Sequence, residues 1–225
     1  MSPELPALKG RPSPSAPRNP FFLPPLYPIL VPSRIGSGGL AEICGFAREL
    51  VAGGTTLIQL GEKQASAKEI LRLARELRRV LPAEIKLIVN DRADLAVAVQ
   101  ADGVHVGEDD IPPEAARQIV GPNRILGVST HNPEQTEKAS QSFVDYVAIG
   151  PVFNTTSKNN LDPVIGLEGV RRARARTQRP LVAIGGITLQ NCQSVIRSGA
   201  DSVAVISELL GDPRKTTADF LLKMR

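Results

Sequence analysis

The sequence predicts a single (β/α)8 TIM barrel, because strand-like and helix-like segments alternate along most of its length. From residue 26 onward, eight short apolar runs are each followed by a segment with helical character. Most of these runs are continuously apolar, which indicates strands buried on both faces of a parallel sheet. Eight such units in about 200 residues fit a closed barrel. The alternative is an open doubly wound sheet, but no GxGxxG motif follows the first strand.

The predicted strands are short runs rich in valine, isoleucine and leucine. Clusters of glycine, proline and polar residues, which are typical turn residues, separate them from the helices. The first strand contains Pro28, whose missing amide hydrogen is awkward inside a sheet. The strands are expected at residues 26–31, 55–60, 85–89, 101–106, 125–128, 147–149, 181–184 and 202–205.

Capping signals mark several of the helices between these strands. Ser66 and Glu69 have the spacing of a capping box, so a helix is expected to open there. Asn132 is a good N-cap for a helix with Pro133 in its first turn. A glycine pair at 53–54 fits a helix end. Helices are expected at residues 40–52, 66–80, 91–100, 112–120, from 132, at 167–176 and 188–197, and in a last portion up to 224.

The composition favours small anionic partners over nucleic acid. The chain has 225 residues, of which 42% are hydrophobic, enough for one large core. Its net charge of +4 suits either nucleic acid or small anionic substrates. Aromatic residues make up only 4% and tryptophan is absent, so no stacking platform for a single strand is expected. The arginine run at 171–176 is expected on a solvated outer helix face.

No apolar run approaches the length of a membrane span, and the N-terminus has no apolar signal-peptide core. Cys44 and Cys192 stand far apart, outside any metal-binding motif, and are expected to be buried free thiols. The protein is therefore expected to be cytoplasmic, with no membrane partner. Residues 1–25 are rich in proline, serine and arginine, so a disordered extension is expected before a barrel domain at 26–225. A role as a PxxP ligand is the alternative for that extension.

The stretch YVAIGPVFNTTSKNN, residues 146–160, carries the clearest functional signal. A buried strand ends at its Gly-Pro pair and opens into a loop whose hydroxyls and ammonium suit a phosphorylated ligand. Residues 185–186 and 206–207, at two later strand ends, offer backbone amides to a phosphate. The alternatives are a solvated loop and plain tight turns. The polar loop residues are Thr155, Thr156, Ser157 and Lys158.

Two carboxylates after different strands point to a divalent cation. Asp91 and Asp110 can share Mg²⁺ with a substrate phosphate, since this ion prefers one or two carboxylates together with phosphate oxygens. The alternatives are helix N-capping by Asp91 and a solvated acidic turn at 108–110. His105 and His131 lack metal-ligand spacing with each other, and His105 is interpreted as a hydrogen-bonded structural residue.

In their order and spacing, these motifs resemble those of thiamine-phosphate synthases, from residue 26 to the C-terminus. The resemblance implies a barrel enzyme that couples two phosphorylated small molecules. A hydroxymethylpyrimidine diphosphate loses pyrophosphate, and the nitrogen of a thiazole phosphate takes its place. Of these motifs, general phosphate-binding barrels share only the Gly-Gly-Ile segment at 185–187. The matching segments are QLGEK at 59–63, VND at 89–91, DGVHVGEDD at 102–110, ILGVSTH at 125–131, YVAIGPVFNTTSK at 146–158, AIGGIT at 183–188 and GADSVAVIS at 199–207.

The same resemblance implies Mg²⁺ as cofactor, held by Asp91 and Asp110. Lys63, Ser129 and Lys158 are implied as catalytic residues, with Ser129 on the leaving diphosphate. The implied substrate-binding residues are Gln59, Lys63, Asn90, Ser129 and Lys158 for the pyrimidine diphosphate, and Thr155, Ser157, Gly186, Ile206 and Ser207 for the thiazole phosphate. Gly61 and Thr156 are also implied as substrate-binding positions, without assignment to one substrate.

One position departs from the family pattern. The family usually reads Q-x-R-x-K, with the arginine on the diphosphate, whereas this chain has Gly61 there. Loss of a charge-assisted contact would cost about 1.5–3 kcal/mol, so Gly61→Arg is expected to raise activity unless the gap is compensated. Arg34, another side chain or a water are the alternatives for filling it.

Two rival functions stay open on the sequence. A thiazole tautomerase on the same fold resembles the synthase but commonly lacks the metal-binding aspartate after the asparagine, which is present here as Asp91. A non-catalytic barrel that binds a phosphorylated ligand would explain the glycine at position 61. Magnesium-dependent turnover separates the synthase from both. The sequence is compatible with a homo-oligomer and does not fix the oligomeric state.

Overall fold

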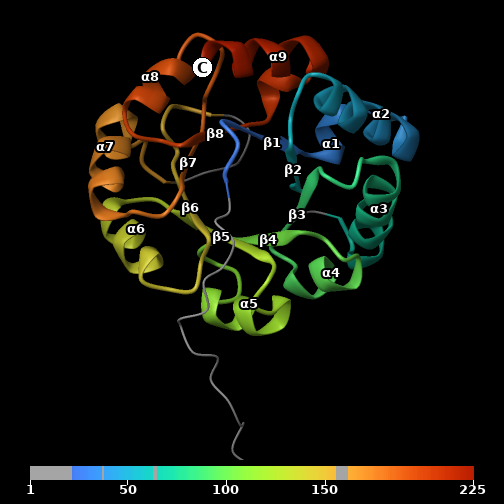
Figure 1. Ribbon diagram of the computed structural model, residues 1–225, viewed down its shortest axis with the longest axis horizontal. Coiled ribbons are helices and arrows are strands. Elements are labelled where there is room, and N and C mark those ends of the chain that lie inside the picture. Colours follow the sequence, from blue (N-terminus) through green and yellow to red (C-terminus); the bar gives the residue numbers. More distant parts are fainter. Residues whose placement is uncertain (1–21, 37, 63–64, 156–161) are drawn as a thin grey trace, which may run out of the picture.

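Eight parallel strands close into a barrel in the computed structural model, which describes residues 22–36, 38–62, 65–155 and 162–225 (Figure 1). Each strand pairs with the next one along the chain, and β8 pairs with β1, so the sheet has no edge. The predicted (β/α)8 barrel is confirmed. The strands are β1 Leu26–Leu30, β2 Leu57–Leu60, β3 Lys86–Asn90, β4 Gly103–Val106, β5 Ile125–Thr130, β6 Tyr146–Ile149, β7 Leu181–Ile184 and β8 Ser202–Val205.

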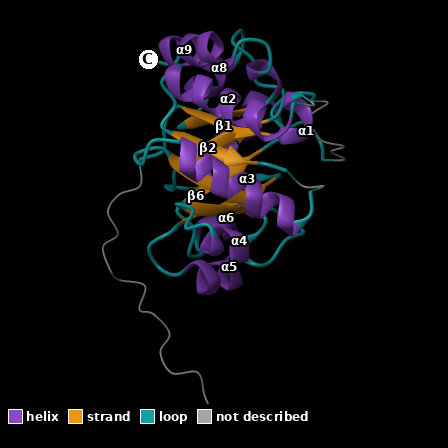
Figure 2. Cartoon of the chain, turned by 90° about the vertical axis from the view of Figure 1, so that its right-hand side faces the viewer, coloured by secondary structure: helices purple, strands orange, loops and turns teal. Residues whose placement is uncertain are grey.

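Helices cover the outside of this ring of strands (Figures 1 and 2). The short helix α1 was not expected from the sequence, and α4 and α8 are shorter than the predicted segments. No helix within the described ranges is long and apolar enough to cross a membrane. The helices are α1 Pro32–Ile35, α2 Gly39–Ala52, α3 Ala67–Val80, α4 Ala93–Ala98, α5 Pro113–Val120, α6 Pro133–Ser140, α7 Gly166–Arg176, α8 Cys192–Arg197 and α9 Pro213–Lys223, with a 3₁₀ turn η1 at Ser207–Leu209.

The capping signals of the sequence are present in the structure. Ser66 caps α3, its side chain accepting from the Glu69 amide while the Glu69 side chain accepts from the Ser66 amide. Asn132 caps α6 by accepting from the Gln135 amide. Pro28 is tolerated because β1 changes partner there: it pairs with β8 through Leu26–Pro28 and with β2 from Ile29.

The alternation of side chains along each strand builds two separate apolar layers. Residues that point inward, such as Leu57 and Ile88, pack with each other at the barrel axis. Their neighbours Ile58 and Leu87 point outward and pack beneath the helices. Both faces of every strand are therefore buried, which explains why the strands are continuous apolar runs in the sequence.

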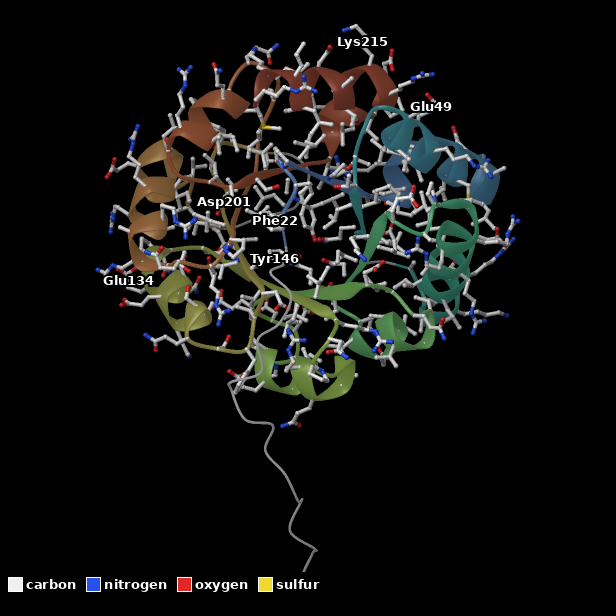
Figure 3. The ribbon with its side chains drawn as sticks, in the orientation of Figure 1. Phe22, Glu49, Glu134, Tyr146, Asp201 and Lys215 are labelled. Carbon is white, nitrogen blue, oxygen red and sulfur yellow. The ribbon has the colours of Figure 1, made fainter. Side chains whose placement is uncertain are left out.

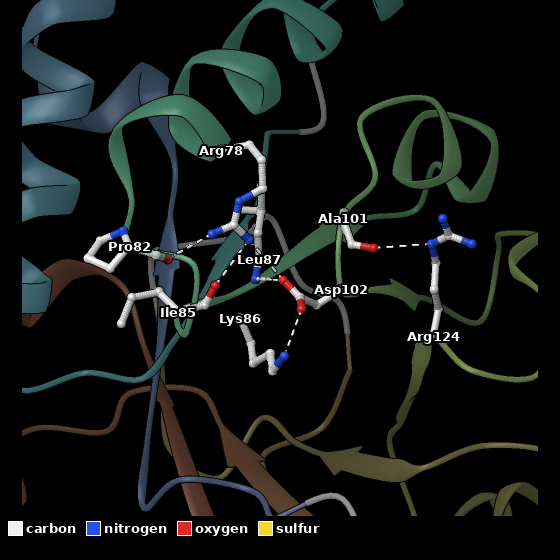
Figure 4. Close-up of polar contacts among 8 residues, drawn as sticks. All are labelled: Arg78, Pro82, Ile85, Lys86, Leu87, Ala101, Asp102 and Arg124. Atoms are coloured by element: carbon white, nitrogen blue, oxygen red, sulfur yellow. Dashed lines mark hydrogen bonds and ion pairs between the residues drawn. The ribbon is translucent and has the colours of Figure 1, made fainter. Parts of the chain in front are cut away.

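At the N-terminal ends of the strands, carboxylates fasten neighbouring strands together. Asp102, directly before β4, donates its backbone N–H to Leu87 O and accepts the Leu87 N–H on its side chain, both at 2.9 Å. Its carboxylate also accepts from Arg78 of α3 at 3.0 Å and from Lys86 at 2.9 Å (Figure 4). Arg78 donates in addition to Pro82 O and Ile85 O.

This arrangement occurs three times around the barrel, and we call each instance an aspartate clamp. Each clamp joins an aspartate that precedes an even-numbered strand to a leucine in the preceding strand and an arginine in the helix before that strand. Most clamp side chains are at least partly buried. The clamps are Asp102 with Leu87 and Arg78, Asp145 with Leu126 and Arg117, and Asp201 with Leu181 and Arg174.

Cys44 and Cys192 lie in α2 and α8 as buried free thiols, as the sequence predicts. Burial raises the pKa of both thiols, so both stay protonated and poorly nucleophilic at neutral pH.

Candidate active site

A cavity of about 1030 Å³ opens at the C-terminal ends of the strands. Every one of the eight strands contributes to its wall, either directly or through the residue that follows it. Tyr146, in this wall, lies inside the ring of strands, whereas Glu49, Glu134 and Lys215 lie on outer helices (Figure 3). Active sites of (β/α)8 barrels lie at this end, so the cavity is the candidate active site.

The floor of the cavity is a continuous series of hydrogen bonds that we call the buried polar chain. Gln59 Nε2 donates to Asn90 Oδ1 at 2.7 Å, and Tyr27 OH donates to Gln59 Oε1 at 2.8 Å. The Tyr27 and Tyr146 hydroxyls are 2.6 Å apart. The chain then passes from Tyr146 OH to His105 Nδ1 at 2.9 Å and ends with Ser129 Oγ, 2.9 Å from His105 Nε2.

Tyr146 reaches His105 because the strand between them presents a glycine. In the register of the sheet, Gly127 of β5 stands between His105 of β4 and Tyr146 of β6. A Cβ atom at Gly127 would overlap the Tyr146 ring, so any larger residue would displace the phenol. The polar chain therefore depends on the lack of a side chain at this position.

Carboxylates gather on the side of the cavity formed by the β4 end. Asp110 is half-buried and its Oδ2 accepts the Gly107 N–H at 2.7 Å. Glu108 and Asp109 are exposed beside it. Asp91 follows β3 and does not line the cavity, but it holds a left-handed backbone with φ of 60°, which is costly for a residue with a side chain. Its amide donates to His105 O at 2.7 Å, which anchors this conformation to β4.

The donor set suits a hard cation that takes further ligands from substrate. Within the described ranges, no three His, Cys, Asp or Glu side chains gather closely enough to hold a metal ion by themselves. Two carboxylates from neighbouring strand ends agree with Mg²⁺, which keeps several water or phosphate ligands. The N-cap position of α4 is occupied by Arg92, whose side chain makes no capping bond.

The opposite side of the cavity has the features of a phosphate site. Gly185 and Gly186 follow β7 with φ of 104° and 62°, and side chains there would overlap the loop after β6. Ser207, after β8, accepts a 3.4 Å hydrogen bond from Arg34 Nη1. Of the lysines and arginines that the structure describes, only Arg34 lines the cavity. Backbone turns, a hydroxyl and a guanidinium thus meet where barrels of this type bind phosphate.

Comparisons with known proteins agree with this geometry. The family model of thiamine monophosphate synthase matches residues 26–209, which is most of the chain. The chain belongs to the thiamine monophosphate synthase family. A thiamine-phosphate synthase from Koribacter versatilis is 58% identical over 200 residues, covering 88% of this chain and 95% of the relative. A thiamine-phosphate synthase from Moorella thermoacetica is 41% identical over 184 residues, covering 81% and 87%.

One solved structure agrees with the assignment to the thiamine monophosphate synthase family. A thiamine phosphate pyrophosphorylase from Pyrococcus furiosus superimposes with a TM-score of 0.78 at 34% identity, covering 89% of this chain and 95% of that one. Phosphoribosyl anthranilate isomerase from Thermus thermophilus has a TM-score of 0.64 at 13% identity, covering 88% and 98%, which shows a shared fold alone.

Most of the residues that the family resemblance implies lie in one cavity wall. Of the implied residues that the structure describes, only Asp91 does not line the cavity. Lys63, Thr156, Ser157 and Lys158 lie outside the described residues. The implied residues that line the cavity are Gln59, Gly61, Asn90, Asp110, Ser129, Thr155, Gly186, Ile206 and Ser207.

The structure changes the expectation for Gly61, where the thiamine monophosphate synthase family usually has arginine. A Cβ atom at Gly61 would overlap the Cγ2 methyl of Ile29, which is stiff because isoleucine is β-branched. Gly61→Arg alone is therefore expected to lower stability by about 1–3 kcal/mol through overpacking rather than raise activity. Ile29→Ala removes the methyl, so we expect the double variant to be more active than Ile29→Ala alone.

Initial rates and thermal melting of the wild type, both single variants and the double variant check this prediction. An active and stable Gly61→Arg single variant would contradict the steric argument.

Sequence reasoning missed the two tyrosines of the buried polar chain, Tyr27 and Tyr146, which it assigned only to strands or their boundaries. Their spacing from inward-facing residues of the same strand could have identified them. Tyr27 stands two residues before inward-facing Ile29, and Tyr146 two before inward-facing Ala148. His105, interpreted as a hydrogen-bonded structural residue, makes such bonds and also lines the cavity.

Proposed function

We propose that this protein is a thiamine-phosphate synthase. It condenses 4-amino-2-methyl-5-(diphosphomethyl)pyrimidine with 4-methyl-5-(2-phosphoethyl)thiazole to give thiamine phosphate and pyrophosphate. The observation that carries the proposal is the 58% identity to the Koribacter versatilis thiamine-phosphate synthase over 95% of that relative. The placement of the implied site residues around one cavity supports it.

Departure of pyrophosphate is the demanding step of this transferase reaction. The electron-rich aminopyrimidine stabilises the positive charge left on its methylene carbon, so the protein needs no covalent intermediate. What it supplies is the positioning of two substrates and the stabilisation of charge on the leaving group. Asn90 serves this purpose: its carbonyl oxygen accepts from Gln59, which orients the amide so that its NH₂ group can donate to the diphosphate.

The charge balance of the cavity supports a requirement for Mg²⁺. The described part of its wall carries one guanidinium, on Arg34, and six carboxylates. Such a wall repels a diphosphate unless cations intervene. Bound Mg²⁺ would neutralise charge on the leaving pyrophosphate, with Asp91 and Asp110 as its protein ligands. Lys63 and Lys158 would add ammonium groups. The carboxylates are Glu62, Glu108, Asp109, Asp110, Asp162 and Glu208.

The thiazole phosphate is assigned to the side of the cavity formed by the β6, β7 and β8 ends. Thr155, Gly186, Ile206 and Ser207 line this side, and Arg34 extends to it from the β1 end. The arrangement places the phosphate of one substrate away from the acidic run at 108–110, where the diphosphate of the other would bind with its metal. The two free thiols fit a cytoplasmic location, which we propose as well.

A magnesium-dependent pyrophosphate-release assay tests the function. We expect release only when both substrates and Mg²⁺ are present, and loss of release when either substrate is omitted or the metal is chelated. Release from the pyrimidine diphosphate alone would contradict a coupling enzyme. No release, with thiazole phosphate still bound in calorimetry, would favour a tautomerase or a non-catalytic barrel.

A further inference from the structure

Glu62 is a buried carboxylate in the cavity wall that the proposed reaction does not use. The residue is only 8% exposed, and burial of a carboxylate is costly unless its oxygens accept hydrogen bonds. Glu62 Oε2 accepts the backbone N–H of Ser33 at 3.0 Å. This bond joins the segment after β2 to α1, the four-residue helix that follows β1. It therefore connects two neighbouring strands at the cavity end of the barrel.

Packing contributes little to holding α1 in place. Of the four residues of this helix, only Pro32 is buried. A second cavity, of about 390 Å³, lies against α1, and residues of α2 and α3 line its other sides. Ser33 and Glu62 line both cavities, so the bond between them stands at their common boundary. With few buried apolar contacts, the position of α1 depends on its hydrogen bonds.

The bond between Ser33 and Glu62 fixes the start of this helix. Pro32 occupies the first position and has no N–H, so the Ser33 amide is the first one of the helix. Amides at this place have no acceptor among the helical residues, and Glu62 supplies one. The Arg34 amide, next along the chain, donates to Val31 O at 3.0 Å. The backbone from which the Arg34 side chain extends is therefore held in place.

Arg34 carries the single guanidinium or ammonium group in the described part of the cavity wall. Its Nη1 donates to Ser207 Oγ at 3.4 Å, across the pairing of β1 with β8. Arg34 is exposed, and a long side chain loses conformational entropy when it is ordered on a ligand. A fixed backbone limits where the guanidinium can lie, and its planar fork of donors suits a phosphate.

We propose that Glu62 is a positioning residue that holds α1 through the Ser33 amide, so that Arg34 binds the phosphate of the thiazole substrate beside Ser207. This assignment rests on the proposed function. Glu62 acts through its hydrogen bond and not through its charge, since a negative charge in the wall repels phosphate. Arg34 serves the thiazole phosphate and not the diphosphate, because its guanidinium lies at the β8 end.

The first test compares the KM values of the two substrates in the pyrophosphate-release assay. Arg34→Ala is expected to raise KM for the thiazole phosphate about tenfold, the effect of one lost charge-assisted hydrogen bond, and to change KM for the pyrimidine diphosphate less than about twofold. Arg34→Lys keeps the charge without the fork, so an intermediate KM is expected. Arg48→Ala is the control, because it removes an exposed guanidinium of α2 that does not line the cavity.

Two results would overturn the assignment of Arg34. One is an unchanged KM for the thiazole phosphate in Arg34→Ala, and the other is an equal rise in KM for both substrates. A wild type that releases no pyrophosphate would contradict the proposed function instead, so the two failures are distinguishable.

Two variants of Glu62 separate its hydrogen bond from its charge. Glu62→Asp keeps the charge but shortens the side chain, so the contact with Ser33 is lost and KM for the thiazole phosphate is expected to rise about fivefold. Glu62→Gln keeps the length and an acceptor oxygen, so KM is expected to stay within about twofold of the wild type. The opposite order of the two variants would overturn the role of Glu62.

The double variant tests whether Glu62 acts through Arg34. In an Arg34→Ala background, Glu62→Asp is expected to change KM for the thiazole phosphate less than about twofold, and equal effects in both backgrounds would contradict the proposal. Exchange of the Ser33 amide is measured without substrate, so its result does not depend on the proposed function. It is expected to be faster in Glu62→Asp and unchanged in Glu62→Gln. An unchanged rate in Glu62→Asp would show that this bond does not hold α1.

Discussion

Asp145→Ala is expected to lower the free energy of unfolding by about 3–5 kcal/mol, because it leaves a buried guanidinium without its carboxylate. The Asp145 side chain is 14% exposed and that of Arg117 only 7%, and the two are 2.7 Å apart. The variant also removes the acceptor of the Leu126 amide. For a domain of this size the loss corresponds to a fall in melting temperature on the order of 10 °C.

Asp201→Ala is the matched control for this prediction. Asp201 makes the same two kinds of bond, to the Leu181 amide and to Arg174, but its side chain is 49% exposed. Water can replace the lost contacts there, so a loss of only about 1 kcal/mol is expected. Urea unfolding of both variants measures the difference. Equal losses would show that burial of the ion pair does not decide the strength of a clamp.

Asp110→Asn is expected to reduce kcat on the order of a hundredfold or more, with a raised requirement for Mg²⁺. Asparagine keeps the shape of the side chain and an oxygen to accept the Gly107 amide, so the loop is preserved while the charge is removed. Rates measured across a range of Mg²⁺ concentrations report the change. Partial recovery at high Mg²⁺ is expected if the lost charge acts through the metal.

Glu114→Gln controls for the general loss of a negative charge, since Glu114 is exposed in the first turn of α5 and does not line the cavity. Its rate is expected to stay within about twofold of the wild type, as is usual for an isolated surface charge. A similar fall in both variants, or an unchanged requirement for Mg²⁺ in Asp110→Asn, would count against a metal at this position.

The fold was predictable because barrel strands carry a redundant signal. Each is apolar on both faces and ends at turn residues, so the limits of β7 and β8 match the expected residues. The helices were less predictable at their starts. Helix α4 begins only at Ala93, two residues later than expected. The reason is that Asp91, the residue after β3, adopts a left-handed backbone conformation. Such a conformation leaves no local pattern, since it is held by a contact with His105 in the next strand.

Some residues of the candidate site could likewise be predicted from the sequence, and others could not. Polar groups after strand ends, such as Ser207, were found because their position in a barrel implies their role. Tyr27 and Tyr146 were missed because their hydroxyls meet across the barrel axis, 119 residues apart in sequence. The overlap that a side chain at position 61 would make with Ile29 also involves residues from different parts of the sheet, so only the structure could reveal it.

The barrel consists of four consecutive strand pairs, which we call quarters, and the aspartate clamps hold only three of them together. Three strand pairs, β3–β4, β5–β6 and β7–β8, are each fastened by an aspartate at the start of the second strand. Before β2 the corresponding residue is Thr56, which has no carboxylate. The quarter that carries Arg34 and Gly61 therefore lacks this fastening. We expect amide exchange by local opening to be fastest there, which would let Arg34 adjust its position while the rest of the ring stays closed.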